Sequence, residues 1–595
     1  MNLVNRHRGP DDSGKFSEDG VSFGSNRLKI IDLSDKAAQP MKSFDEREVI
    51  VFNGEIYNFK ELKDELKSFY PFKSESDTEV VLASYRKWGS DCVKKFNGIF
   101  AFAIWDRSRR EIFLARDHIG VKPLYYYLNG GKFIFSSEIK SILEHPISRR
   151  LNLEAFNQYL RVLYVPEPLT MFEGIYKFPQ ASRAFYKDGK LNIEKYWSVE
   201  PGNYLDISKT HVEEELRNRI QQSVKTQLIS DRPLGIYLSG GIDSSVVLAS
   251  ASKIRSAIDT FSVGFELKEE EQKEKFNADF KLAKKTASFF GSNHHEVLIK
   301  PSEVFDLFEK SAWFTDEPIS NPTAVSMLKL SGFSKEKVDV VLTGDGGDEL
   351  FGGYDRYRLS LAASLFQKIP HFLRSPFNLN SWFKKLNTPA GIERFRLFMF
   401  QKDDILNRVI SSDYFNYDIS KSFFEKKYFN QIIENTKFEE TFMNVDRQTW
   451  LTDFALMLGD KLSMASGVEA RVPLLDKNLV EFAARIPLKY KVGFFNTKKI
   501  LKDAYKGRIP DFLLNQPKRG WFSPGAKWLR MDEMRLVAEE ILSDGYYSET
   551  APLFNWPEVK EVFKMHLISK EYNLTILWAI LTFQIWARRY NIKIK

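Results

Sequence analysis

The sequence predicts a mixed α/β protein in two parts: a strand-rich first part, then a doubly wound α/β part that ends in a helical region. The first part shows short alternating or apolar runs separated by turn residues, such as Glu48–Phe52 and Gly98–Trp105. In the second part, long helical periodicity is interrupted by the apolar runs Leu234–Leu238 and Val338–Leu342. Such runs are typical of parallel strands buried on both faces.

The length of the chain also favours two parts, because 595 residues exceed what a single core normally accommodates. We place the first at residues 1–195 and the second at 205–595, with a linker around Tyr196–Tyr204. The region beyond residue 360 is mostly helical in pattern.

Composition excludes several classes of protein. The net charge of +8 comes from 87 basic against 79 acidic residues with no basic cluster, so we expect no nucleic-acid partner. The single cysteine, Cys92, rules out a disulfide framework and suits the cytoplasm. The apolar run Leu574–Ala587 is shorter than the ~20 residues of a spanning helix, so we expect a buried helix and no membrane contact.

The segment Ser239–Ser245 (SGGIDSS) has the pattern of a phosphate-binding loop. It follows one of the apolar runs and precedes the helical run Ser244–Arg255. Gly240 and Gly241 let the backbone approach an anion, and Ser244 and Ser245 are placed to cap the helix and donate to phosphate oxygens. Asp243 is placed to hold a metal ion. The alternative is a plain strand–loop–helix turn.

A second loop, Thr343–Tyr354, follows the other apolar run. It holds five glycines and three acids, Asp345, Asp348 and Glu349, which is too much glycine and charge for core packing. Both loops are expected at the carboxyl ends of parallel strands, where ligands bind in open α/β sheets.

In this order, the two loops resemble the pyrophosphate loop and the carboxylate loop of the asparagine synthetase family of class-II amidotransferases. The segments Phe261–Phe265, Asp316–Pro318 and Asp460–Asp476 match the same family. The resemblance implies an ATP-pyrophosphatase domain that forms an acyl-adenylate. It also implies these roles: Leu238, Val263, Thr343 and Gly344 hold adenosine; Ser239, Gly240, Gly241, Ser244 and Ser245 hold phosphate; Asp243 and Asp348 bind Mg²⁺; Asp345 helps to form β-aspartyl-AMP; Lys518 neutralises phosphate charge.

Lys518 lies in the segment Gln516–Gly520, where the family usually has arginine in place of Gln516. A solvated surface lysine is therefore the alternative for Lys518.

Short segments of the first part resemble the glutaminase domain of the same family, an N-terminal nucleophile sandwich. By this resemblance Arg27 binds the glutamine α-carboxylate, Glu55 and Asp77 face its ammonium group, and Asn53 with Gly54 forms the oxyanion hole. Taken alone, Asn53-Gly54 would suggest a hairpin turn.

Glutaminase chemistry of this type needs an N-terminal cysteine whose own amine acts as base. The sequence starts Met1-Asn2, and Cys92 lies inside a helical run, where we expect a small structural residue. We therefore expect a truncated sandwich. Either the start codon is assigned too late or lost, which we favour, or the protein begins here.

The predicted function is ATP- and Mg²⁺-dependent conversion of aspartate to asparagine, with AMP and pyrophosphate as products. Nitrogen comes from glutamine in the family and from ammonia in this chain. Two alternatives remain: a related amidotransferase acting on another carboxylate, such as a sugar acid of a surface polysaccharide, and a non-catalytic scaffold or regulatory subunit. A homodimer is left open.

Overall fold

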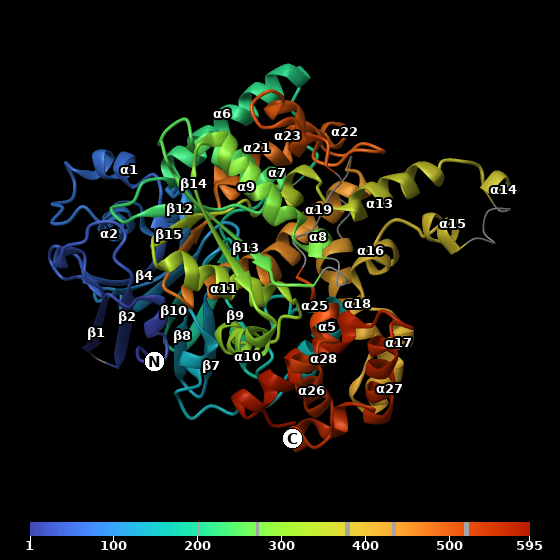
Figure 1. Cartoon of the computed structure of the whole chain (residues 1–595). Helices are drawn as coiled ribbons and strands as arrows, with labels where there is room; N and C mark the ends of the chain where they lie inside the picture. Colours follow the sequence, from blue (N-terminus) through green and yellow to red (C-terminus); the bar gives the residue numbers. More distant parts are fainter. Residues whose placement is uncertain are drawn as a thin grey trace.

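The computed structural model describes residues 1–594 except 19, 200, 269–272, 375–380, 431–435 and 517–522 (Figure 1). The first part is built on a six-stranded antiparallel sheet in the order β11-β10-β6-β5-β4-β3. Its strands are β3 (Met41–Lys42), β4 (Glu48–Ile56), β5 (Gly98–Asp106), β6 (Glu111–Arg116), β10 (Ser182–Lys187) and β11 (Lys190–Lys195).

Both faces of this sheet are buried. Successive side chains along each strand point to opposite sides, so every strand contributes to both faces. Ile50 and Phe52 pack with the helices α1 (Phe59–Leu66), α2 (Asp77–Trp88) and α3 (Cys92–Lys95). Val49 and Val51 pack on the other face, against two smaller sheets. These are β1 (Asp12–Glu18) with β2 (Val21–Arg27), and β8 (Lys132–Ser136) with β7 (Tyr125–Asn129) and β9 (Ile175–Lys177).

The second part contains a five-stranded parallel sheet in the order β14-β13-β12-β15-β16. The strands are β12 (Leu234–Tyr237), β13 (Asp259–Phe265), β14 (Asn293–Ile299), β15 (Val340–Leu342) and β16 (Glu469–Arg471). The chain runs outward from β12 through β13 to β14, then returns to the other side of β12 as β15. The point where the order reverses therefore lies between β12 and β15.

Helices cover both faces of this sheet, which confirms the predicted doubly wound arrangement. Val340 and Leu342 face one helical layer and Val341 faces the other. The first layer holds α6 (Lys209–Gln227), α7 (Ile242–Ala251), α9 (Ala278–Phe290), α21 (Lys477–Ala484) and α23 (Lys499–Tyr505); the second holds α10 (Val304–Thr315), α11 (Thr323–Lys335) and α20 (Met457–Met464). In Figure 1, α6, α21 and α23 of the first layer lie above the sheet, and α10 and α11 of the second lie below it.

The chain between β15 and its end is mostly helical. Its helices outside the two layers are α12 (Gly347–Phe351), α13 (Asp355–Phe366), α14 (His371–Arg374), α15 (Ser381–Leu386), α16 (Ile392–Met399), α17 (Asp403–Val409), α18 (Tyr417–Phe424), α19 (Phe438–Gln448), α22 (Leu488–Lys491), α24 (Asp511–Leu514), α25 (Gly525–Trp528), α26 (Asp532–Ile541), α27 (Trp556–Leu567) and α28 (Leu574–Tyr590). Helices of the earlier chain outside the layers are α4 (Ile139–Ile142), α5 (Leu153–Val162) and α8 (Lys273–Phe276).

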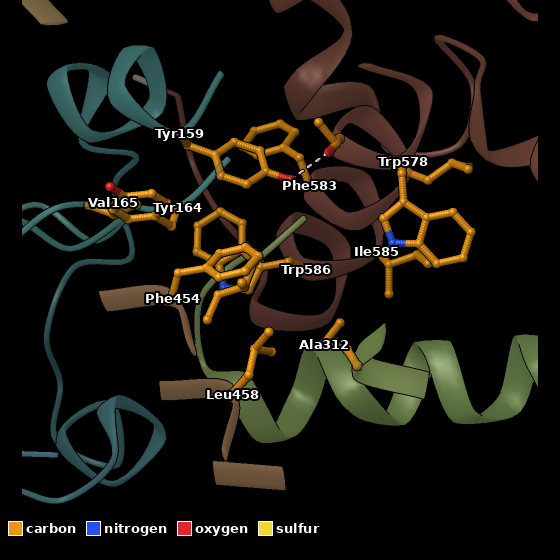
Figure 2. Close-up of a cluster of buried hydrophobic side chains, with 14 of the residues drawn as sticks. Tyr159, Tyr164, Val165, Ala312, Phe454, Leu458, Trp578, Phe583, Ile585 and Trp586 are labelled. Carbon is orange, nitrogen blue, oxygen red and sulfur yellow. Dashed lines mark hydrogen bonds between the residues drawn. The ribbon is translucent and has the colours of Figure 1, made fainter. Parts of the chain in front are cut away.

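The last helix, α28, confirms the buried helix predicted for Leu574–Ala587 and runs three residues further, to Tyr590. Figure 2 shows Trp578 and Trp586 of α28 in one cluster with Tyr159 of α5. The Tyr159 hydroxyl donates to the carbonyl of Ala579 at 2.8 Å. Within the described part of the chain, no helix is both long and apolar enough to cross a membrane.

This cluster also crosses the boundary that the sequence suggested. Tyr159 belongs to the predicted first part, yet it lies among core residues of the second. A second cluster joins Ile30 and Ile99 to α6 and β12 in the same way. Two of the hydrophobic clusters are therefore shared between the two parts.

Candidate active site

The two glycine-rich loops meet where the strand order reverses, as expected for a ligand site in an open α/β sheet. One loop follows β12 and leads into α7; the other follows β15 and leads into α12. A Cβ atom on Gly344 would lie 2.5 Å from the backbone nitrogen of Ser244, and one on Gly347 would lie 2.4 Å from Oδ1 of Asp243. Only glycine allows the loops to approach this closely.

The predicted capping role of two serines is wrong. Helix α7 begins at Ile242 with Gly241 as its N-cap, so Ser244 and Ser245 lie inside its first turn. The Ser245 hydroxyl donates to the Gly241 carbonyl at 2.7 Å. The Ser244 hydroxyl accepts from the backbone nitrogen of Ser239 at 3.2 Å, which shapes the loop from within.

A buried lysine, Lys498, joins the two loops and was not identified from the sequence. Its ammonium group contacts the Asp243 carboxylate and lies 2.6 Å from Oδ1 of Asp348. Burial opposes the charged ammonium, but the two carboxylates outweigh it and hold the pKa of Lys498 above its ordinary value. Lys498 immediately precedes α23, outside any glycine-rich segment, so no local pattern marks it.

The lysine that the sequence suggested for charge neutralisation, Lys518, lies outside the described residues. Lys498 is the lysine that the described structure brings to the two carboxylates.

The same two carboxylates suit a magnesium ion. Asp243 and Asp348 are about one-fifth exposed, come from different loops and both contact the Lys498 ammonium. Magnesium prefers few carboxylates together with substrate phosphate oxygens and water. Among the described residues, no group of three or more His, Cys, Asp or Glu side chains could hold a metal ion. Phosphate oxygens would therefore have to complete the coordination.

The third acid, Asp345, is partly buried, like Asp243 and Asp348. It accepts a hydrogen bond from the Thr343 hydroxyl at 2.6 Å. Burial raises the pKa of Asp345, the Thr343 hydroxyl lowers it, and the negative charges of Asp243 and Asp348 raise it further.

A cavity of about 950 Å³ opens beside the first loop. Leu238, Ser239 and Val263 line it, as expected for three of the residues proposed to hold ATP. Thr343 and Gly344 are not among its lining residues; Gly344 instead lies against the backbone of Asp243 and Ser244. A largely apolar cavity next to a glycine-rich loop at the end of a strand suits a small-molecule ligand that carries an anionic group.

The glutamine-binding residues predicted in the first part also converge. Arg27, Asn53, Gly54, Glu55 and Asp77 all line one cavity of about 830 Å³. Asn53 and Gly54 lie within β4 opposite β5, so the alternative of a hairpin turn is wrong.

The three charged residues predicted to bind glutamine, Arg27, Glu55 and Asp77, each already have a protein partner. Arg27 donates to the backbone carbonyls of Ile31, Asp32 and Ser34. Asp77 accepts from the backbone nitrogen of Ile56 at 2.9 Å, and burial raises the pKa of Asp77 to about 6.

Two strand edges face this cavity. Residues of β2 and β8 line it, and each of these strands pairs on one side only, with β1 and β7 respectively.

Cys92 is not among the residues that line this cavity. It is fully buried in α3, and burial raises the pKa of its thiol far above the ordinary value. The prediction that Cys92 is a structural residue is consistent with this position.

One arginine connects the two candidate sites. The Arg471 guanidinium lies 3.2 Å from Glu55 in the first cavity and 2.9 Å from Glu469. The Arg471 carbonyl accepts a hydrogen bond from the backbone nitrogen of Thr343 at 2.9 Å, at the start of the carboxylate loop. A single residue therefore contacts both sites, and it was not identified from the sequence.

Comparison with known proteins identifies the family of the chain. The family model for asparagine synthase matches residues 215–588, and that for the glutamine amidotransferase domain matches residues 1–197. Asparagine synthetase [glutamine-hydrolyzing] 1 of Bacillus subtilis is 32% identical over 98% of this chain and 92% of the relative. Asparagine synthetase [glutamine-hydrolyzing] 3 of the same organism is 33% identical, over 86% of this chain and 81% of the relative.

More distant relatives carry other names. Amidase chry2 of Gibberella zeae is 28% identical over 88% of this chain and 84% of the relative. The match to the asparagine synthase model covers more than half of the chain, and the bacterial relatives match nearly all of it. The chain therefore belongs to the asparagine synthase family, as a carbon–nitrogen ligase that carries a glutamine amidotransferase domain in its first 197 residues.

Proposed function

We propose that this chain converts aspartate to asparagine by way of a β-aspartyl-AMP intermediate. The observation that carries the proposal is the cluster of Asp243, Lys498 and Asp348 between the two loops, beside the cavity at Leu238. Lys498 offers a positive charge, and the two carboxylates offer ligands for Mg²⁺, where a pyrophosphate leaving group would lie; the cavity offers space for the nucleoside.

The first step joins the β-carboxylate of aspartate to the α-phosphorus of ATP. A carboxylate oxygen forms the new P–O bond, and pyrophosphate leaves with the electrons of the bond that breaks. Lys498 is placed to stabilise the negative charge that develops on pyrophosphate, since phosphoryl-type transfer depends mostly on positioning and charge stabilisation. Asp243 and Asp348 would hold Mg²⁺, which supplies further charge compensation on the phosphate oxygens when bound.

The second step joins nitrogen to the activated carbonyl carbon. Ammonia forms the C–N bond, AMP leaves with the C–O bond electrons, and the added nitrogen loses a proton. We propose free ammonia as the donor for these 595 residues, because their only cysteine is buried in α3 and its thiol pKa is raised. A thiolate for attack on glutamine is thus lacking.

The test measures AMP and pyrophosphate release with aspartate, ATP and Mg²⁺, using ammonia or glutamine as nitrogen source. We expect asparagine from ammonia and none from glutamine. Asp243→Asn and Asp348→Asn are each expected to abolish AMP formation while the circular dichroism spectrum is kept. Wild-type turnover in either variant at saturating Mg²⁺ would refute the assignment.

Other acceptors give a second candidate function, supported by the amidase names among the relatives. A sugar acid or another carboxylate that releases pyrophosphate faster than aspartate would favour it. No ATP-dependent pyrophosphate release with any carboxylate would favour the scaffold alternative. A homodimer remains a prediction, which light scattering of the purified chain tests.

A further inference from the structure

An arginine at the start of α13 lies in an aromatic cage beside the carboxylate loop. The Arg356 guanidinium lies 3.8 Å from the ring centre of Tyr354 and 5.3 Å from that of Trp450. Its Nε donates to Asp446 Oδ2 at 2.8 Å, and that oxygen also accepts from the Tyr357 hydroxyl at 2.6 Å. These contacts fix the plane of the guanidinium before any ligand arrives.

Two polar atoms of this cage have no partner among the described residues. They are Nη2 of Arg356 and Oδ1 of Asp446, and both are buried. Leaving a buried polar atom unpaired is costly, and more so when the group is charged. Native proteins rarely keep such atoms without a ligand or a water to pair them.

The cage lies close to the proposed reaction centre. A Cβ atom on Gly353 would lie 2.2 Å from Lys498 Cε, so the backbone at Gly353 touches the lysine between the loops. Arg356 follows three residues later, so the two Cα atoms are at most roughly 11 Å apart. Tyr354, which forms one wall of the cage, also donates to Glu349 of the carboxylate loop at 2.6 Å.

We propose that Arg356 binds the α-carboxylate of the acceptor amino acid and so determines acceptor specificity, with Asp446 as the residue that positions it. This rests on the proposed function, in which the β-carboxylate of the acceptor is adenylated near Lys498. A guanidinium is suited to the task, because its planar donors match a carboxylate and it stays charged. An amino acid with a second carboxylate is the substrate class that can span the two points.

A structural role is the alternative, in which Arg356 only ties α13 to α19 through Asp446 and water completes the two unpaired atoms. The two roles differ in what they predict for β-alanine, which keeps the ammonium group and the carboxylate to be activated but lacks the α-carboxylate. Loss of a structural contact would reduce activity on aspartate and β-alanine equally. Loss of an α-carboxylate contact would affect only aspartate.

The experiment compares wild type, Arg356→Met and Arg356→Lys by pyrophosphate release with each substrate. β-Alanine is also measured as an inhibitor against aspartate, so that its affinity is obtained even without turnover. Wild type is expected to prefer aspartate by at least about 100-fold. In Arg356→Met, kcat/KM for aspartate falls by about that factor, while the constants for β-alanine change less than about threefold.

The ratio between the two substrates is independent of the fraction of folded protein, so a partly unfolded variant still gives a decisive answer. Arg358→Met is the matched control: Arg358 lies on the same helix with a partly exposed side chain paired to Asp355, and its ratio is expected to stay at the wild-type value. An unchanged ratio in both Arg356 variants, with wild type active on aspartate, would overturn this inference alone. A wild type that releases no pyrophosphate with aspartate would refute the proposed function, and this inference with it.

Discussion

The closest contact between the two loops provides a sharp test of the site, through the substitution Gly347→Ala. The added methyl group would lie 2.4 Å from Oδ1 and 2.5 Å from Cγ of Asp243. A Cβ atom essentially never lies within 3.0 Å of another heavy atom to which it is not bonded. Gly347 lacks a positive φ angle, so alanine adds no backbone strain there. The substitution therefore acts on the distance between the loops.

The expected cost follows from that overlap. Asp243 must move, yet Lys498 holds its carboxylate, so the shift disturbs the cluster that we assign to phosphate and Mg²⁺. Overpacking of this kind costs roughly 1–3 kcal/mol. If this strain falls on the nucleotide-bound state, kcat/KM for ATP drops by roughly 5- to 150-fold, since about 1.4 kcal/mol corresponds to tenfold.

The assay is pyrophosphate release at limiting ATP, with thermal unfolding measured in parallel. Gly332→Ala in α11 is the control, because its Cβ would have no neighbour nearer than 3.8 Å, at the Ser466 hydroxyl. It is expected to keep wild-type kcat/KM. Wild-type kcat/KM in Gly347→Ala would refute the view that the loops must meet at Asp243.

Three further predictions concern single lysines and the cysteine. Lys498→Met is expected to lower AMP formation by at least about 100-fold while the protein stays folded. A loss below tenfold would contradict the role of its charge. Cys92→Ser is expected to lower the unfolding free energy by about 1–3 kcal/mol and to leave ammonia-dependent turnover per folded molecule unchanged, as urea titration and turnover assays would show. Burial lowers the pKa of Lys491 to about 7 from 10.5, so the unfolded chain binds more protons between these values and stability rises with pH across that range. In urea titrations this rise, at most about 5 kcal/mol, is expected to disappear in Lys491→Met, and an identical pH dependence in both proteins would contradict it.

The glycine patterns indicated a candidate nucleotide site because they are local. A strand, two glycines and a helix start within a few residues mark a loop that admits an anion, whatever the rest of the chain does. The acids of the second loop carry the same kind of local signal. The order of strands and helices likewise predicted the parallel sheet, which has its reversal of strand order at these loops.

The remaining assignments depended on neighbours that are distant in sequence. Lys498 meets Asp243 across 255 residues, and Arg356 meets Asp446 across 90. The sharing of cores between the two parts has the same origin, since Tyr159 and Ala579 are 420 residues apart. Local pattern determined which loops form the candidate site and which strands pair in parallel. Only the tertiary structure decided which charges face one another, because an ion pair depends on the packing of whole elements and leaves no periodic trace in the sequence.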